Sequence, residues 1–388
     1  MLRLVNLKLN LIKFRSLQLV LMILLVGISA CGNNNRATNK LAADSKEAQK
    51  LDGNLTFNDV TLEQADEKGR TLWKVKAKQA SYSQDQKVAR VQNPAGELFQ
   101  DGKLVYRIKA QSGEVQQDGK QIFLKGQIVA TAVQDGAVLK GNELEWRPKE
   151  DLLIVRNNLT GTHPQVQATA KEARVSSRAR RMEFLGQVVA NTKEPALQMR
   201  TEHLVWQMAK QLVIGDRPIQ IDRYVNQAVA DRATADQSQV DLKAKTATLK
   251  QNAQLALLDP PVQITSNAMT WNLQNQTVVS DQAVRVVHQQ QQVNLTADRG
   301  QLDLQQRTFY LTGNVHGVGQ RNQSKLDAEQ LTWNIPTQAI MAEGNVVYDQ
   351  ANPPLHLKGP KAVGTLQGQS VVISGGETGG RVVTEIIP

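Results

Sequence analysis

The stretch Leu331-Thr332-Trp333 has three earlier counterparts, and together they decide how this chain folds. In each one an apolar residue stands two positions before a tryptophan, and successive tryptophans are 60, 65 and 62 residues apart. On a strand this spacing places both side chains on one face, whereas on a helix they diverge. The motif therefore predicts strands. Its earlier copies are Leu144-Glu145-Trp146, Leu204-Val205-Trp206 and Met269-Thr270-Trp271.

A second series of residues recurs along the chain with the same spacings between its successive members. Its alanines are again 60, 65 and 62 residues apart. The chain from about Ala77 onward is therefore predicted to be an array of tandem units of ~31 residues, a length at which elongated repeat architectures stack. The series comprises Ala110, Ala170, Ala235 and Ala297, and apolar residues also recur eight positions after each tryptophan at Ile154, Ile214, Val279 and Met341.

Short runs with alternating apolar residues recur along the chain, as at Phe309 and Leu311, and no sustained helical stripe follows the N-terminal segment. Such runs predict short antiparallel strands, about two in each unit. Pairs of the Asp-Gly and Gly-Asn type are predicted to form the turns. The fold class is therefore all-β, with turns expected at Asp101-Gly102, Asp118-Gly119, Asp135-Gly136, Gly313-Asn314 and Gly344-Asn345.

An array of ~20 strands is too large for one flat sheet, so we expect a sheet folded over into two layers. Ten rungs spaced by ~4.8 Å predict a body roughly 50 Å long. Many inward positions hold Ala, Val or Ser. Small side chains fill little volume, so the layers either leave a groove between them or close tightly, and the sequence leaves both readings open.

The N-terminal segment has the pattern of an export signal. Four basic residues and no acid precede an apolar run over residues 17–30, which ends in Ile28-Ser29-Ala30-Cys31. We interpret residues 1–30 as a signal or anchor segment resembling a bacterial lipobox, with Cys31 lipidated; an uncleaved helical anchor is the alternative. Residues 31–54 are predicted to be a flexible polar tether, and residues 55–388 one continuous extended β-body. A single cysteine excludes an intramolecular disulfide.

Composition argues for an anionic partner and against catalysis. The formal net charge is +10, and without the four N-terminal basic residues 42 Lys and Arg still face 36 acids. This excess favours phosphate-bearing lipids and membrane surfaces, whereas nucleic-acid binding is not expected in an exported chain without basic stripes and stacking aromatics. The histidines are dispersed, and no nucleophile elbow or phosphate loop is present. We predict no enzyme, no cofactor and no metal site.

Several stretches resemble the LptC family of lipopolysaccharide export proteins. Residues 66–77 (DEKGRTLWKVKA) are similar to its opening strands, and Asn93-Pro94 and residues 124–128 (LKGQI) to the strands that follow. Farther on, the segments 328–333 (AEQLTW) and 344–346 (GNV) resemble the related LptA and OstA-type jellyroll. The likeness covers most of residues 55–350. The chain departs from the family in two ways. It is about twice the usual length, which would fit an extended cyanobacterial-type member, and its N-terminus resembles a lipoprotein signal where better-known members have a single transmembrane helix.

The resemblance implies an elongated, V-shaped β-jellyroll in the periplasm, anchored to the inner membrane. Its expected cargo is lipopolysaccharide, received from the LptF/LptG transporter and passed toward the outer membrane. Open strand edges at the two ends are expected to dock neighbouring proteins by strand addition. One edge would face the transporter through Leu55, Phe57, Val60 and Leu62, and the other an LptA-like or outer-membrane jellyroll through Val371, Ile373, Val382 and Val383.

For contact with the lipid we predict the apolar set of the repeat, although packing between the layers is the competing role at each position. Two other functions stay open at this point: a passive envelope scaffold or spacer with a closed β-body, and a carrier of other lipoproteins with one closed cavity. The predicted lipid-binding residues are Val115, Ile122, Leu124, Ile128, Leu144, Trp146, Ile154, Leu204, Trp206, Ile214, Met269, Trp271, Leu331 and Trp333.

Replacing Cys31 by Ser tests the predicted anchor. The thiol is the acceptor of the diacylglyceryl group, so the variant is expected to incorporate no radiolabelled acyl chains. Labelling equal to that of the wild-type chain would exclude lipidation at Cys31.

Overall fold

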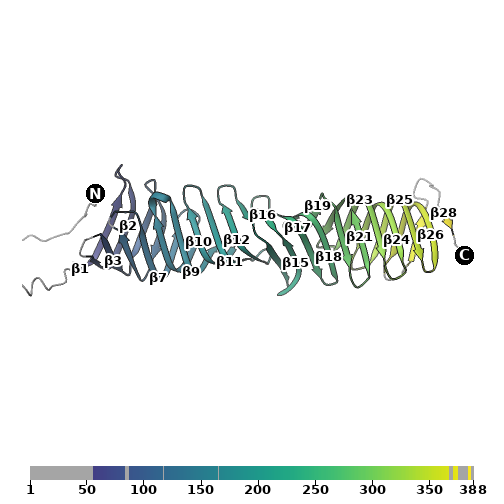
Figure 1. Ribbon diagram of the computed structural model, residues 1–388, viewed down its shortest axis with the longest axis horizontal. Coiled ribbons are helices and arrows are strands. Elements are labelled where there is room, and N and C mark those ends of the chain that lie inside the picture. The colour runs from purple at the N-terminus through teal and green to yellow at the C-terminus, as the bar shows by residue number, and fades with distance from the viewer. Residues whose placement is uncertain are drawn as a thin grey trace, which may run out of the picture.

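The computed structural model describes residues 56–83, 87–116, 118–164, 166–366, 370–374 and 383–385. The body is a long, narrow all-β structure, with its first strands at one end and its last strands at the other (Figure 1). One 28-stranded sheet contains all of its strands, and β1 and β28 lie at opposite ends of it. The prediction of an all-β fold is therefore confirmed.

The strands are separated by short turns, and the one helical element is the 3-10 helix η1 (Pro148–Glu150) among the described residues. The strands are β1 (Thr56–Ala65), β2 (Thr71–Tyr82), β3 (Val88–Gln92), β4 (Ala95–Gln100), β5 (Lys103–Lys109), β6 (Ser112–Gln116), β7 (Ile122–Ala132), β8 (Val138–Arg147), β9 (Leu152–His163), β10 (Val166–Ser176), β11 (Arg181–Thr192), β12 (Leu197–Gln207), β13 (Leu212–Gly215), β14 (Ile219–Val225), β15 (Ala228–Ala235), β16 (Gln237–Asp241), β17 (Thr246–Leu258), β18 (Pro261–Asn272), β19 (Thr277–Ser280), β20 (Val284–His288), β21 (Val293–Ala297), β22 (Arg299–Asp303), β23 (Thr308–Gly319), β24 (Ser324–Asn334), β25 (Ala339–Ala351), β26 (Pro354–Thr365), β27 (Ser370–Ser374) and β28 (Val383–Glu385).

The sheet is a simple meander. From β7 to β12 each strand pairs antiparallel with the next strand along the chain. The same holds from β23 to β26. At other places two short strands follow each other and together take the place of one long strand. Thus β3 and β4 both pair with β2, and β19 and β20 both pair with β18. Each long strand, or each pair of short strands, therefore forms one rung, and successive rungs stack along the length of the body.

A bend in the middle of each rung turns the sheet back on itself. In β23 the bend is made by Gly313 and Asn314, with φ of 80° and 45°, and in β25 by Gly344 and Asn345, with φ of 80° and 47°. The register of pairing shifts at both places. Consecutive left-handed residues form the same bend in β7, β9, β11 and β17, at Gly126-Gln127, Asn157-Asn158, Gly186-Gln187 and Gln251-Asn252, whereas the long strands between them, such as β8, β10 and β24, contain no such pair.

These bends correct one expectation from the sequence. Gly313-Asn314 and Gly344-Asn345 were predicted to be turns between strands, but they lie inside β23 and β25. The Asp-Gly pairs, in contrast, do lie in turns. A tight hairpin turn and this bend both need two successive residues with positive φ, so both select glycine and asparagine. Residue preference alone therefore cannot separate them.

Because each long strand bends, half of it lies in one layer and half in the other. The first layer ends at the turns 148–151, 177–180, 208–211, 242–245, 273–276, 304–307 and 335–338, which we call the first turn row. The second layer ends at 101–102, 133–137, 193–196, 226–227, 259–260, 289–292, 320–323 and 352–353, the second turn row. Since both layers share every rung, about twenty steps of ~4.8 Å give a body ~100 Å long, twice the length expected.

The first turn row shows where the ~31-residue period comes from. The amides of Leu273, Leu304, Ile335 and Leu366 are spaced by 31 residues. Each donates to a carbonyl of the preceding turn, over 2.9, 3.0, 3.0 and 3.1 Å. Many of these turns also begin with an Asp or Asn, as at Asp303, whose Oδ1 accepts from the amides of Gln305 and Gln306 at 2.8 Å. The repeat is thus one pair of rungs that is hydrogen-bonded to the pair before it.

The apolar faces of the two layers meet in two successive cores. One extends from Leu62 to Met182 and the other from Leu197 to Ala362. Large side chains with less than 2 % of their surface exposed are most frequent in the first core, among them Trp73, Trp146 and Leu124. The continuous sheet therefore covers an interior that is packed differently in its two halves.

Replacing Gly344 by Ala tests the bend. A Cβ there would lie 2.6 Å from Glu329 Oε2 at a φ of +80°, whereas at Gly136, with φ of +72°, it would meet no atom within 4 Å. Both substitutions strain the backbone, which costs about 1–2 kcal/mol. Because of the added clash, urea denaturation should show Gly344→Ala to be roughly 1 kcal/mol less stable than Gly136→Ala. Equal losses would contradict this role of the bend.

Candidate functional site

The predicted lipid-binding residues lie mostly between the two layers. Trp206 and Ile214 are partly exposed, and the other twelve are buried. Contact of this set with a lipid stays a prediction, since burial between layers is equally the position of a packing residue. The inward, buried members are Val115, Ile122, Leu124, Ile128, Leu144, Trp146, Leu204, Met269, Trp271, Leu331 and Trp333.

Ile154 and Ile214 were expected to face inward, and the strand register corrects this. In the hairpin after each tryptophan, the residue seven positions on lies directly opposite it: Leu153 opposite Trp146 and Val213 opposite Trp206. Side chains alternate between the faces, so the residue eight positions on points outward. Ile154 accordingly lies between Glu145 and Arg174 on the outer face, where it is buried.

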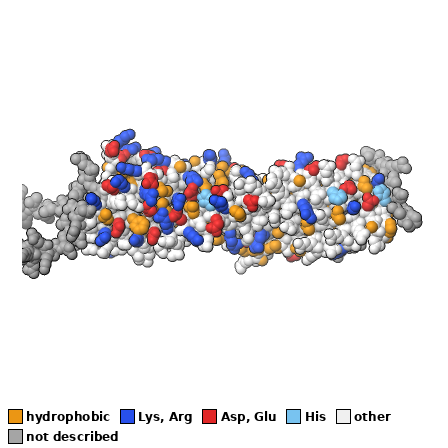
Figure 2. All heavy atoms as spheres, in the orientation of Figure 1, with side chains coloured by type: hydrophobic (Ala, Val, Ile, Leu, Met, Phe, Trp, Pro, Cys, Tyr) orange, Lys and Arg blue, Asp and Glu red, His pale blue; other side chains and the backbone are white. Residues whose placement is uncertain are grey.

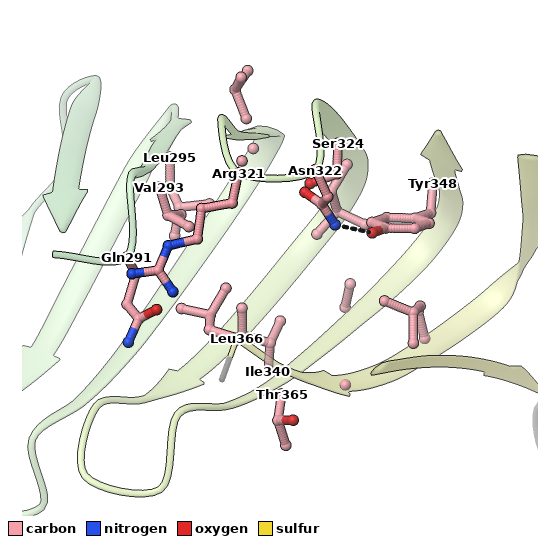
Figure 3. Close-up of a pocket in the computed structure, with 18 of the residues that line it drawn as sticks. Gln291, Val293, Leu295, Arg321, Asn322, Ser324, Ile340, Tyr348, Thr365 and Leu366 are labelled. Carbon is pink, nitrogen blue, oxygen red and sulfur yellow. Dashed lines mark hydrogen bonds between the residues drawn. The ribbon is translucent and has the colours of Figure 1, made fainter. Parts of the chain in front are cut away.

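An apolar cavity of about 110 Å³ lies between the layers near the C-terminal end. Ile340 and Leu366 line it from one side, and Val293 and Leu295 from the other (Figure 3). Ligand pockets usually measure about 300–1,000 Å³, so this space holds a long hydrocarbon chain only if the layers part further. A second interior cavity of about 20 Å³ lies between Leu255 and Phe309.

The two turn rows meet along a line that we call the mouth, opposite the bends. Side chains from the two rows, and from the strand ends next to them, touch there across large sequence separations. None of these contacts is a backbone ladder bond, so the layers can separate at the mouth without loss of strand pairing. The contacts are Arg178 Nε to Asp101 Oδ2 at 3.1 Å, His163 to Trp206 at 5.6 Å between ring centroids, His288 to Trp333 at 5.7 Å, and Gln291 Nε2 to Gln338 Oε1 at 3.2 Å.

Buried polar atoms without partners gather in this interior. The indole N–H of all five tryptophans is buried and makes no hydrogen bond to the described residues. Neither ring nitrogen of His288 has a partner, although only 1 % of this residue is exposed. An unmade buried hydrogen bond costs about 1–3 kcal/mol, so the interior is more polar than a purely structural core requires.

His288 lies at the edge of the mouth in a stack of three rings. Its ring is 5.7 Å from Trp333, which stacks on Phe309 at 5.6 Å. Burial lowers the pKa of His288 below its ordinary value of 6.5, and the nearby charge of Arg321 lowers it further. The imidazole is therefore neutral at pH 7.

The predicted partner edges lie at the two ends of the sheet. The described part of β1 pairs on one side only, with β2, and β27 and β28 pair only with β26. At the N-terminal edge Phe57 is exposed, Val60 half-buried and Leu62 buried. At the other edge Val371 and Ile373 are half-buried. Docking of a partner at either edge stays a prediction.

Some predictions concern residues outside the described part of the chain, namely the signal segment 1–30, Cys31, the tether 31–54, Leu55 and Val382. The side chain of Val383 is likewise outside it. No helix within the described ranges has the length and apolar character needed to cross a membrane. The described residues also contain no group of three or more His, Cys, Asp or Glu side chains arranged to hold a metal ion.

Sequence reasoning missed the cavity and its polar rim. Leu326 and Ile340 line the apolar part, and Arg321 and Gln291 lie at the mouth beside it. Ile340 could have been predicted from the sequence, because the residue seven positions after each tryptophan is its hairpin partner. Arg321 carries no such periodic signal. Its position beside Gln291 depends on how successive turns of the second turn row lie next to each other.

Comparisons with known proteins point to one family. A family model described as "Lipopolysaccharide-assembly, LptC-related" matches residues 19–154 and 151–255. The two matches adjoin each other, in tandem, over more than half of the chain. No curated protein matches.

Among solved structures, the chain matches the crystal structure of LptH, the LptA homologous periplasmic component of the conserved lipopolysaccharide transport device from Pseudomonas aeruginosa. The sequence identity is 10 % and the TM-score 0.20, and the match covers 37 % of this chain and 79 % of that one.

Replacing His288 by Phe tests the neutral buried imidazole. A lowered pKa means that the unfolded chain takes up this proton more readily, so the contribution of His288 to stability is present above the ordinary pKa and is lost as the pH falls toward the folded value. The wild-type melting temperature is expected to fall between about pH 7 and pH 5, and to fall less in His288→Phe. An identical fall in both chains would contradict a neutral His288.

Proposed function

The chain belongs to the LptC-related family of lipopolysaccharide-assembly proteins, and from that premise we propose that it carries lipopolysaccharide across the periplasm with the acyl chains between its two layers. A role in lipopolysaccharide transport follows from the family. The path through this molecule, its anchoring and its individual partners are our proposal.

The physical need for such a path comes from the acyl chains. Each CH₂ group left in water costs about 0.8 kcal/mol, so a lipid with several chains requires a continuous apolar environment. The interior here is bordered by apolar side chains from both layers along all rungs between Leu62 and Ala362. A path of repeated, similar contacts without a deep pocket favours sliding over tight binding at one place.

The observation that carries the proposal is the apolar cavity at the mouth. There the layers already stand apart, with Val293 and Leu295 facing Ile340 and Leu366 (Figure 3). A hydrophilic glycan cannot follow the acyl chains into the interior, because burying unpaired hydroxyl groups is costly. The glycan is therefore expected to move along the outside of the mouth, while the side-chain contacts between the turn rows part in front of it.

We place the protein in the periplasm, held at the inner membrane through Cys31, with the N-terminal edge toward the LptF/LptG transporter. The C-terminal edge, where the cavity lies, would pass the lipid to an LptA-like or outer-membrane jellyroll. Among the described residues the outer edges of β1 and β27 pair with no further strand, which supports docking by strand addition. A length of ~100 Å would let one chain cover much of the distance between the membranes.

A passive spacer is the second candidate function. The N-terminal core favours it, because Trp146, Ile122 and Leu124 have none of their surface exposed. A closed core in that half suits a rod that holds two membranes apart. In the transport proposal the same side chains must move aside when the layers part.

A photo-crosslinking residue at Leu326 tests the transport function. Leu326 lines the cavity, while its neighbour Lys325 is exposed on the opposite face of β24. In cells, the probe at position 326 is expected to capture lipopolysaccharide and the probe at 325 to capture little or none. A third probe at Leu124 reports whether the path also crosses the packed N-terminal half. Equal capture at 325 and 326, or none at 326, would count against transport through the interior.

A further inference from the structure

Arg321 lies in the second turn row, on the rim of the apolar cavity. Its side chain extends toward Gln291 in the preceding turn of the same row (Figure 3), and one guanidinium nitrogen donates to the carbonyl of Gln290. No carboxylate among the described residues lies within 4.0 Å of it. Arg178, in the first turn row, instead pairs with Asp101 at 3.1 Å.

Among the described residues that line the cavity, Arg321 is the one with a charged side chain. Charged side chains on the face shown in Figure 2 gather more densely over the N-terminal half than over the C-terminal half. The remaining polar rim of the cavity is neutral: Asn322 donates to Gln350 Oε1 at 2.9 Å, and the hydroxyl of Tyr348 donates to the same oxygen at 2.8 Å. The cavity therefore has an apolar floor and a single cationic group at its rim.

The side-chain amide of Gln291 contributes a hydrogen-bond acceptor, Oε1, that receives no hydrogen bond from the described residues. Its Nε2 donates to Gln338 Oε1 at 3.2 Å, while its Oε1 is buried and has no partner among the described residues. A buried acceptor without a donor, beside a guanidinium without a carboxylate partner, calls for a ligand that supplies both a hydroxyl donor and an anionic group.

We propose that Arg321 and Gln291 form a head-group site at the mouth, which binds a phosphate and a hydroxyl of a phosphorylated glycolipid whose acyl chains enter the cavity. This assignment rests on the proposed transport function and adds to it the place where the cargo is held before it leaves the chain. A guanidinium binds phosphate through parallel, charge-assisted hydrogen bonds, and the sugar hydroxyl would donate to Gln291 Oε1. The apolar floor of the cavity thus matches the acyl chains of such a lipid, and the polar rim matches its head group.

The test compares Arg321→Gln with Arg285→Gln in the full-length purified chain. Arg285 is also exposed and also has no carboxylate within 4.0 Å among the described residues, but it lies on β20 and its Nε donates to Asn294 at 2.9 Å. The probes are bisphosphorylated lipid A, the same lipid after removal of its phosphates, and phosphatidylglycerol. Binding is measured at low and at high salt.

Wild-type chain and Arg285→Gln are expected to bind the phosphorylated lipid A at least tenfold more tightly than the dephosphorylated form at low salt. In Arg321→Gln the preference should disappear through weaker binding of the phosphorylated form, and Arg321→Lys should restore part of it. Phosphatidylglycerol should bind more weakly and respond less to Arg321→Gln, because its phosphodiester carries a single negative charge whereas the phosphomonoesters of lipid A carry up to two.

Four results would overturn the assignment, and the first three separate it from the transport proposal. Equal binding of both lipid A forms by the wild-type chain would exclude the phosphate site while leaving transport intact. An equal loss of preference in Arg285→Gln would show a general charge effect. Phosphatidylglycerol bound as tightly as lipid A, with the same response to Arg321→Gln, would exclude a glycolipid head group. Binding of no lipid at all would overturn both proposals.

Discussion

The bend in each long strand is the constraint on which the rest of the structure depends. Two successive left-handed residues, such as Gly344 and Asn345, turn one strand from the first layer into the second without breaking the chain. Each rung therefore contributes to both layers, and the interior runs the length of the body. The mouth follows from the same geometry, since the ends of the bent strands meet opposite the bend and are joined by side chains alone.

The two halves of the interior differ in a way that bears on transport. In the N-terminal half, Trp73, Trp146 and Leu98 have at most 1 % of their surface exposed, whereas the interior cavities lie in the C-terminal half. Close packing stabilises the body that must stand in the envelope, and looser packing lets the layers part. The unpartnered indole and imidazole nitrogens lie along the same interior and make it a less favourable closed core than an apolar one.

Much of the fold was predictable because it depends on local periodicity. Alternation around Trp146, Trp206 and Trp333 identified strands, and the shared spacing of two residue series identified the tandem repeat, which the hydrogen bonds of the first turn row explain. The bends were mistaken for turns, since both conformations select Gly-Asn. The resulting error in strand length halved the expected length of the body.

The sequence by itself determined the strand class, the ~31-residue period and the apolar set of the interior, because each depends on the alternation of side chains along a strand and on the glycine and asparagine that positive φ requires. Only the tertiary structure decided the face of Ile154, the mouth, and the place of Arg321 beside Gln291. These depend on the register of hairpins and on contacts between turns ~30–80 residues apart, and a register shift of one residue moves a side chain to the opposite face.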